Sequence, residues 1–178
     1  MSDGAAPVTV AVAAAPLSNH ESFLLILHDA AGRRALFDFL KAGYSEHHLT
    51  FWEDVETNYK PLPSAVERDA KAREFWHLYI KNGAKSQINI HEPQRLRLQS
   101  AIEKLDNPNP AGPLEHAQPE LFDEASAHCL ELIKGNYFFP FQQSKQYAAF
   151  QAEKKQREKE EAEQKKKKEK SKGMCVIL

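Results

Sequence analysis

Residues 43–53 read GYSEHHLTFWE, and this stretch predicts the beginning of a helix. Ser45 is a residue type that commonly caps a helix at its N-terminus. Beyond it, the larger apolar side chains recur every three to four residues, at Leu49, Trp52, Val55 and Tyr59. That spacing puts them on one face of a helix, so we expect this face to be buried in a core.

The chain before this stretch has the same helical pattern. Ser18 and Glu21 have the three-residue spacing of a capping box, and an apolar stripe that begins at Phe23 follows them. Either Asp29 or Gly32 then interrupts the helix before a second apolar stripe. We therefore predict two helices upstream of residue 43.

The chain after the central helix is divided by prolines and glycines. Pro61 and Pro63 end that helix, because proline cannot continue it. Ser64 can cap the next helix, which Gly83 closes. Pro93 then stands where a first helical turn tolerates proline.

Two further apolar stripes lie downstream, over residues 98–105 and 122–133, with a loop rich in Pro, Asn and Gly between them. Strand-like alternation occurs nowhere over a useful length. The sequence therefore predicts an all-α body with about seven to nine helices.

The charge is divided unevenly along the chain. Residues 151–178 carry ten Lys/Arg and six Asp/Glu, a net charge of +4, and the preceding body carries 14 and 19, a net charge of −5. A nucleic-acid-binding domain needs a basic face, so the acidic body argues against a nucleic-acid partner. The two cysteines, Cys129 and Cys175, imply no disulfide framework.

The tail is a solvated helix or is disordered, because its Lys, Glu and Gln cannot bury a core face. The chain ends Cys-Val-Ile-Leu, a prenylation pattern in which Cys175 carries the lipid and the final Leu favours geranylgeranyl. One lipid anchors a protein only marginally, so a second, basic signal is needed for an anionic membrane surface. That signal is expected from Lys165, Lys166, Lys167, Lys168, Lys170 and Lys172.

We expect this lipidated tail to hold the chain at the cytoplasmic face of a membrane, in the first place the plasma membrane. The alternative is a charged tail that ends in an accidental cysteine. The predicted organisation is a disordered leader at 1–18, a helical domain at 19–150, a charged tail at 151–174 and the prenylation motif at 175–178.

Four short motifs follow one another along the helical body. Residues 45–52 read SEHHLTFW, residues 87–90 QINI, residues 122–125 FDEA and residues 141–147 FQQSKQY. Each is weak alone, but their order and spacing on an all-α body make the combination specific. Together they resemble the regulator-of-G-protein-signalling (RGS) domain family over roughly residues 20–150.

The resemblance implies an RGS-type fold of about nine helices, with a central antiparallel four-helix bundle and a subdomain where the chain ends meet. It also implies a GTPase-activating protein that binds heterotrimeric Gα subunits in their GTP-bound or transition-state form and attenuates signalling. Gα carries its own catalytic arginine and a glutamine that orients the attacking water. The chain would therefore be no enzyme and would need no cofactor; it would act by binding the switch segments best in their transition-state arrangement.

The resemblance implies which residues would contact Gα: Ser45, His47, His48, Asn89, Leu132, Asn136 and Pro140. Asn89 falls on the family's central asparagine, whose amide contacts the switch region near the water-positioning glutamine. A carboxamide suits that position because it offers a donor and an acceptor without a charge.

Some positions depart from the family pattern. His48 replaces a second interfacial asparagine, His91 an aspartate and Pro140 a frequent arginine. These departures leave open a runner-up function, a membrane-tethered RGS-like scaffold that binds Gα or another partner without accelerating hydrolysis. The pair His47–His48 raises the question of a metal, but no Cys/His/Asp set has convincing ligand spacing. The chain is not itself a GTPase, because it has no G-x-x-x-x-G-K-S/T phosphate loop.

Overall fold

The computed structural model describes residues 18–107 and 115–174, and for residues 169–174 it describes the backbone alone. Within these residues every regular element is a helix, which confirms the predicted fold class. None of the described helices is both long enough and apolar enough to cross a membrane. The predicted leader, apart from Ser18, and the Cys175 motif lie outside the described residues.

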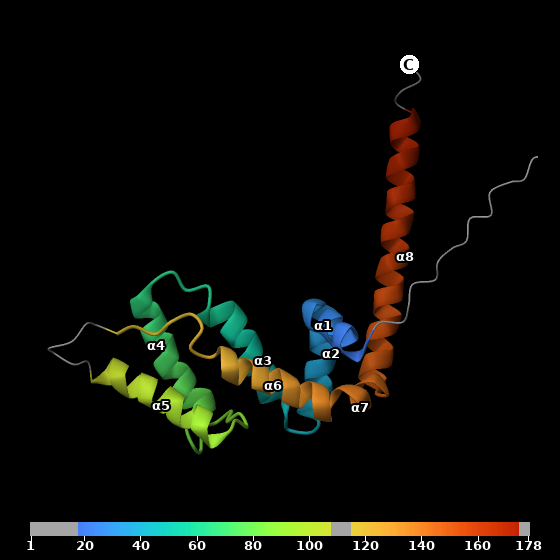
Figure 1. Ribbon diagram of the computed structural model, residues 1–178. Coiled ribbons are helices and arrows are strands. Elements are labelled where there is room, and N and C mark those ends of the chain that lie inside the picture. Colours follow the sequence, from blue (N-terminus) through green and yellow to red (C-terminus); the bar gives the residue numbers. More distant parts are fainter. Residues whose placement is uncertain (1–17, 108–114, 175–178) are drawn as a thin grey trace, which may run out of the picture.

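Eight α-helices follow one another along the described chain (Figure 1). They are α1 (Asn19–His28), α2 (Ala30–Lys41), α3 (Glu46–Asp54), α4 (Ala65–Phe75), α5 (Glu92–Asp106), α6 (Asp123–Asn136), α7 (Phe138–Gln142) and α8 (Lys145–Met174). Two of them continue into a π-helical turn, α3 into η1 (Val55–Tyr59) and α4 into η2 (Trp76–Ile80). With η1 included, the central helix reaches Tyr59, as its apolar spacing predicts.

Helices α3, α4, α5 and α6 form a four-helix bundle around one apolar core. Phe122 lies against Tyr59, with ring centroids 4.9 Å apart, and against Phe75, at 5.5 Å. These three side chains are buried, and Tyr59 also donates a hydrogen bond to the carbonyl of Gln118 at 2.8 Å. Trp52, predicted to share the buried face, is only partly buried.

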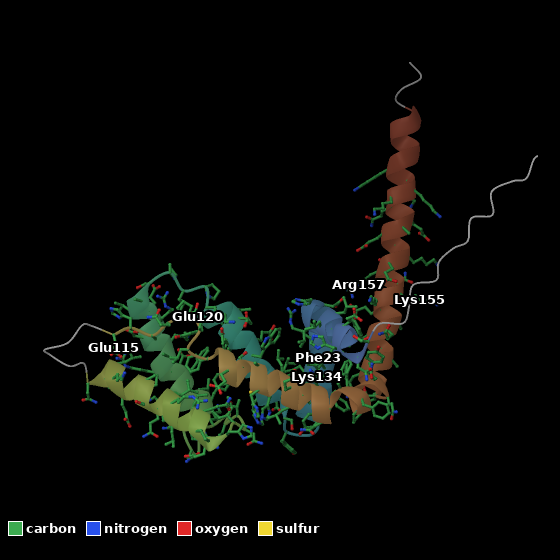
Figure 2. The ribbon with its side chains drawn as sticks, viewed as in Figure 1. Phe23, Glu115, Glu120, Lys134, Lys155 and Arg157 are labelled. Atoms are coloured by element: carbon green, nitrogen blue, oxygen red, sulfur yellow. The ribbon has the colours of Figure 1, made fainter. Side chains whose placement is uncertain are left out.

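The two ends of the domain meet in a second unit made of α1, α2, α7 and the first turns of α8. Phe23 of α1 (labelled in Figure 2) packs edge-on against Phe138 of α7, with ring centroids 5.1 Å apart. Leu49 of α3 and Ile133 of α6 also lie in this second core. Helices α3 and α6 therefore belong to both units, and the two-part arrangement implied by the resemblance is confirmed.

Side-chain caps fix where several helices begin. Ser18 Oγ accepts the N–H of Glu21 at 3.2 Å, and the Glu21 carboxylate accepts the N–H of Ser18 at 2.8 Å, which confirms the predicted capping box. Asp29 accepts the backbone N–H of Gly32 at 3.0 Å and so caps α2. The chain therefore breaks at Asp29, and Gly32 lies inside α2. Ser64 caps α4 as predicted.

The charged tail continues the last helix of the domain. Helix α8 runs for 30 residues, so the tail is helical as far as Met174, one of the two states the sequence allowed. Among the described side chains of α8, Phe150 is the last that is buried. Farther on, Arg157 Nη2 lies 2.7 Å from Asp29 Oδ2 at the α1–α2 junction. Figures 1 and 2 show α8 extending away from the body, with Arg157 on the part near α1.

Candidate functional site

The seven predicted contact residues lie on three segments: Ser45, His47 and His48 at the α2–α3 turn and the start of α3, Asn89 in the loop between η2 and α5, and Leu132, Asn136 and Pro140 on α6 and α7. In Figure 1 the α2–α3 turn and the loop before α5 lie along the lower edge of the molecule, while α8 points upward. Hydrogen bonds join the first segment to the second and to the α6–α7 junction.

Ser45 is buried, and its hydroxyl links the α2–α3 turn to the α6–α7 junction. Its Oγ donates to the carbonyl of Gly43 at 3.2 Å and lies 2.8 Å from the hydroxyl of Tyr137. Ser45 does occupy the N-cap position of α3, but its side chain makes no capping hydrogen bond there. The prediction of a side-chain cap is therefore wrong, because packing brings Tyr137 to the hydroxyl.

His48 lies in the interior of the site, with 8% of its surface exposed. Its Nε2 accepts the backbone N–H of Asn89 at 3.2 Å, and its Nδ1 lies 3.3 Å from the carbonyl oxygen of Ser45. A carbonyl only accepts, so the ring is neutral and carries its proton on Nδ1. Both nitrogens of His48 are thus engaged by the chain's own backbone.

Two further histidines, His47 and His128, lie near His48, and His91 lies beside His128. The ring of His47 lies 4.3 Å from that of His48, and the ring of His91 lies 4.6 Å from that of His128 on α6. Burial is the main cause that lowers the pKa of His48 to about 4, and the neighbouring His47 and His128 contribute to the same shift. Burial also lowers the pKa of His47 and of His128. We therefore expect these three rings to be uncharged at pH 7.

The arrangement of these histidines is not that of a metal-binding site. Among the described residues no group of three or more His, Cys, Asp or Glu side chains is arranged to hold a metal ion.

Asn89 is exposed at the site while its two neighbours are buried. Ile88 and Ile90 are 0% and 6% exposed, and the N–H of Ile88 donates to the carbonyl of Tyr79 at 2.9 Å. Burial alternates along this loop segment, so the two isoleucines face the core and Asn89 faces outward. Its carboxamide is thus exposed on a backbone that hydrogen bonds hold at Ile88 and at Asn89 itself.

The remaining predicted contacts differ in exposure. His47 and Leu132 are half-buried, whereas Asn136 and Pro140 are exposed at the end of α6 and in α7. Asn136 directly precedes Tyr137, the residue that contacts Ser45. The α6–α7 segment is thereby held next to the α2–α3 turn.

Two exposed aromatic residues beside this site were not predicted as contacts. Tyr44 is 85% exposed and has a φ of 55°, in the left-handed region that non-glycine residues rarely adopt. Phe139 is 66% exposed and directly precedes Pro140. Exposed aromatic side chains are typical of protein-binding surfaces. The position of Tyr44 in a turn, outside any helical face, is the sequence signal that could have identified it.

The lysines predicted to contact a membrane lie far along α8. Lys165, Lys166, Lys167 and Lys168 are exposed. Cys175 lies outside the described residues, as do the side chains of Lys170 and Lys172.

Comparison with known proteins identifies the class of domain. The family model described as "Regulator of G protein signaling domain" matches residues 22–150. The chain is 29% identical over 143 residues to "Regulator of G-protein signaling loco" of Drosophila melanogaster, which covers 80% of this chain and 8% of that protein. It is 26% identical over 119 residues to human "Regulator of G-protein signaling 10", covering 67% of this chain and 58% of the relative.

A third similarity is shorter. Human "Regulator of G-protein signaling 16" is 35% identical over 85 residues, which cover 46% of this chain and 42% of the relative. The chain therefore spans less than two thirds of the length of each of these relatives.

Proposed function

This chain belongs to the regulator of G protein signaling family, and on that premise we propose that it binds an active Gα subunit and accelerates its GTP hydrolysis. The observation that carries the proposal is Asn89: its side chain is exposed, between two buried isoleucines and on a backbone bonded to His48. An activator of this kind needs a rigid surface with a few fixed polar groups, and it needs no acid, base or nucleophile of its own.

The mechanism that fits this surface is selective binding of the transition state. Gα supplies the arginine and the water-orienting glutamine, so the remaining barrier includes the cost of ordering its mobile switch segments. A surface that binds the ordered arrangement more tightly than the ground state lowers that barrier. Each ~1.4 kcal/mol of selective stabilisation speeds hydrolysis about tenfold.

The contact surface we propose spans three structural segments. The α2–α3 turn offers Tyr44, the loop before α5 offers Asn89, and the α6–α7 segment offers Asn136, Phe139 and Pro140. All five side chains are exposed. The hydroxyls of Ser45 and Tyr137, 2.8 Å apart, link two of these segments.

Single-turnover GTP hydrolysis by purified Gα, with and without the full chain, tests the proposal. We expect faster hydrolysis by at least one class of Gα. We also expect tighter binding to Gα loaded with GDP and a planar γ-phosphate mimic than to Gα loaded with GDP alone. Equal affinity for the two states, without acceleration, would instead identify the scaffold. The scaffold is the second candidate because proline, which carries no charge, stands at position 140, where the resemblance implies a frequent arginine.

We further propose that α8 carries the domain on a membrane. Its support is the exposure of Lys165–Lys168 near the end of a continuous helix that leads away from the body, together with Cys175, which follows that helix in the sequence. Basic residues close to an anionic surface contribute about 1 kcal/mol each, which complements a single lipid chain. The site of action is then the cytoplasmic face of the membrane that holds Gα.

A further inference from the structure

His48 is the one predicted contact residue whose ring nitrogens both face the chain's own backbone. Nε2 faces the N–H of Asn89 at 3.2 Å, and Nδ1 faces the carbonyl of Ser45 at 3.3 Å. The bond to Asn89 joins residues 41 positions apart, from the first turn of α3 to the loop before α5. With 8% of its surface exposed, His48 offers little to a partner directly.

We propose that His48 is a positioning residue, a neutral hydrogen-bond acceptor that fixes the backbone at Asn89 so that the Asn89 side chain is presented to Gα in one orientation. This inference rests on the proposed function. Fixing a binding loop before the partner arrives removes part of the entropy loss on binding. Because Asn89 is already in place, the domain then binds the transition-state form of Gα more tightly.

The bridge requires the neutral ring. Protonation would place a second N–H at Nε2, directly facing the N–H of Asn89, and neither group could then accept. The groups around His48 favour the neutral form. They are His47 on its own helix and His128 on α6, whereas the hydrogen bond to the Ser45 carbonyl acts in the opposite direction. His91, at the start of α5, lies beside His128 and lowers the pKa of His128.

The acidic neighbours act one step farther out. The carboxylate of Glu46 raises the pKa of His47, and that of Glu124 raises the pKa of His128. Burial outweighs both, and the pKa of His48 lies at about 4. The bridge is therefore formed throughout the range near pH 7.

The geometry of the ring supplies variants that separate its two nitrogens. A glutamine at position 48 carries its amide as many bonds from the backbone as Nε2, so His48→Gln can still accept from Asn89. An asparagine carries its amide at the position of Nδ1, so His48→Asn can reach Ser45 but not Asn89. His48→Ala reaches neither. The matched control is His116→Ala, which removes a histidine hydrogen bond of 2.7 Å to Asp69 elsewhere in the bundle.

Hydrogen exchange of the Asn89 amide in the full chain at pH 7 tests the bridge without any partner. We expect exchange about fivefold to tenfold faster in His48→Ala and His48→Asn, as for the loss of one hydrogen bond, and near-normal exchange in His48→Gln and His116→Ala. The Asn89 amide resonance of the wild type should shift with a midpoint near pH 4 on acidification. Unchanged exchange in His48→Ala would overturn the proposal.

Single-turnover hydrolysis by Gα over a range of chain concentrations tests the consequence. His48→Ala and His48→Asn should lose roughly tenfold in the ratio of maximal rate to half-saturating concentration, the factor for about one hydrogen bond, and His48→Gln should recover most of it. Full activity of His48→Ala, or a loss in His116→Ala equal to that in His48→Ala, would overturn the role. A wild-type chain that activates no Gα refutes the proposed function, while the exchange rates still decide whether His48 fixes Asn89.

Discussion

At the scale of single residues, the site divides into side chains that face outward and side chains that hold them in place. Asn89 is exposed, whereas Ile88, Ile90, Ser45 and His48 are buried around it. Substitutions in the first group should change function with little effect on stability. Substitutions in the second should change both.

Asn89→Ala should lower the acceleration of GTP hydrolysis by about tenfold or more, because it removes a polar contact made in the transition state. The thermal melting temperature should stay close to that of the wild type, since the side chain is exposed. Single-turnover hydrolysis and thermal melting are the two measurements. Lys85→Ala, an exposed position in the same loop, is the control and should keep full activity. Undiminished acceleration in folded Asn89→Ala would remove this residue from the mechanism.

His48 should make the stability of the domain depend on pH. Its pKa is about 4 in the folded chain and about 6.5 in the unfolded chain, so between these values the unfolded chain binds more protons. The stability that the domain gains from keeping His48 neutral is therefore fully present above pH 6.5. It is lost as the pH falls towards 4, by an amount on the order of 3 kcal/mol. Chemical denaturation of wild type and His48→Gln at pH 7 and pH 4.5 measures it. Between pH 7 and pH 4.5 the wild type should lose more unfolding free energy than His48→Gln does. Equal losses in the two proteins would contradict the assignment.

At the scale of helices, the close approach of α1, α2 and α8 depends on Gly32. A Cβ at this position would lie 2.9 Å from the carbonyl oxygen of Ile26 and 3.2 Å from Cζ of Phe150. The first contact is too short for any side chain, and a carbonyl in a packed helix cannot move aside easily. The missing side chain is thus what lets α1 and α8 pack against α2.

Gly32→Ala should therefore destabilise the domain by about 1–3 kcal/mol, the usual range for overpacking. The control is Gly135→Ala in α6, where a Cβ would meet nothing within 4 Å. That substitution should stabilise the domain by about 0.5–1 kcal/mol, because alanine loses less backbone entropy in a helix. Chemical denaturation of both variants distinguishes them. If Gly32→Ala were as stable as Gly135→Ala, the three helices would not be as closely packed as described.

At the scale of the whole molecule, α8 continues from the domain into the charged tail, for which we propose separate lipid and charge signals. Cys175→Ser removes the thiol that prenylation needs, so we expect the protein to move to the soluble fraction even with every lysine present. Neutralising Lys165, Lys166, Lys167 and Lys168 should leave the lipid in place and only weaken retention. Fractionation of cell membranes measures both.

High salt is the control that separates the two signals. It screens charges beyond a Debye length of about 10 Å at 0.1 M, so it should reproduce the effect of neutralising the lysines and not that of Cys175→Ser. In cells the Cys175→Ser protein should regulate Gα poorly, because tethering raises its concentration near a membrane-bound target. A Cys175→Ser protein that stays in the membrane pellet would show that the tail is not the anchor.

The helices and several of their ends could be predicted from local sequence patterns. The spacing from Leu49 to Tyr59 predicted the central helix, and the capping box at Ser18 predicted where α1 begins. These signals are local, because helix periodicity and capping depend on residues three or four positions apart. The order of four short motifs added the family and the position of Asn89.

The contacts that hold the site together depend on the packing of helices that are distant in the sequence. Ser45 meets Tyr137 across 92 positions, His48 meets Asn89 across 41, and Arg157 meets Asp29 across 128. No local pattern encodes such pairs, since each depends on how two helices pack and on which nearby polar group is left without a partner. Packing of the helices therefore turned the serine from a helix cap into a link to the α6–α7 junction. It also buried His48, which the sequence placed among the outward-facing contacts.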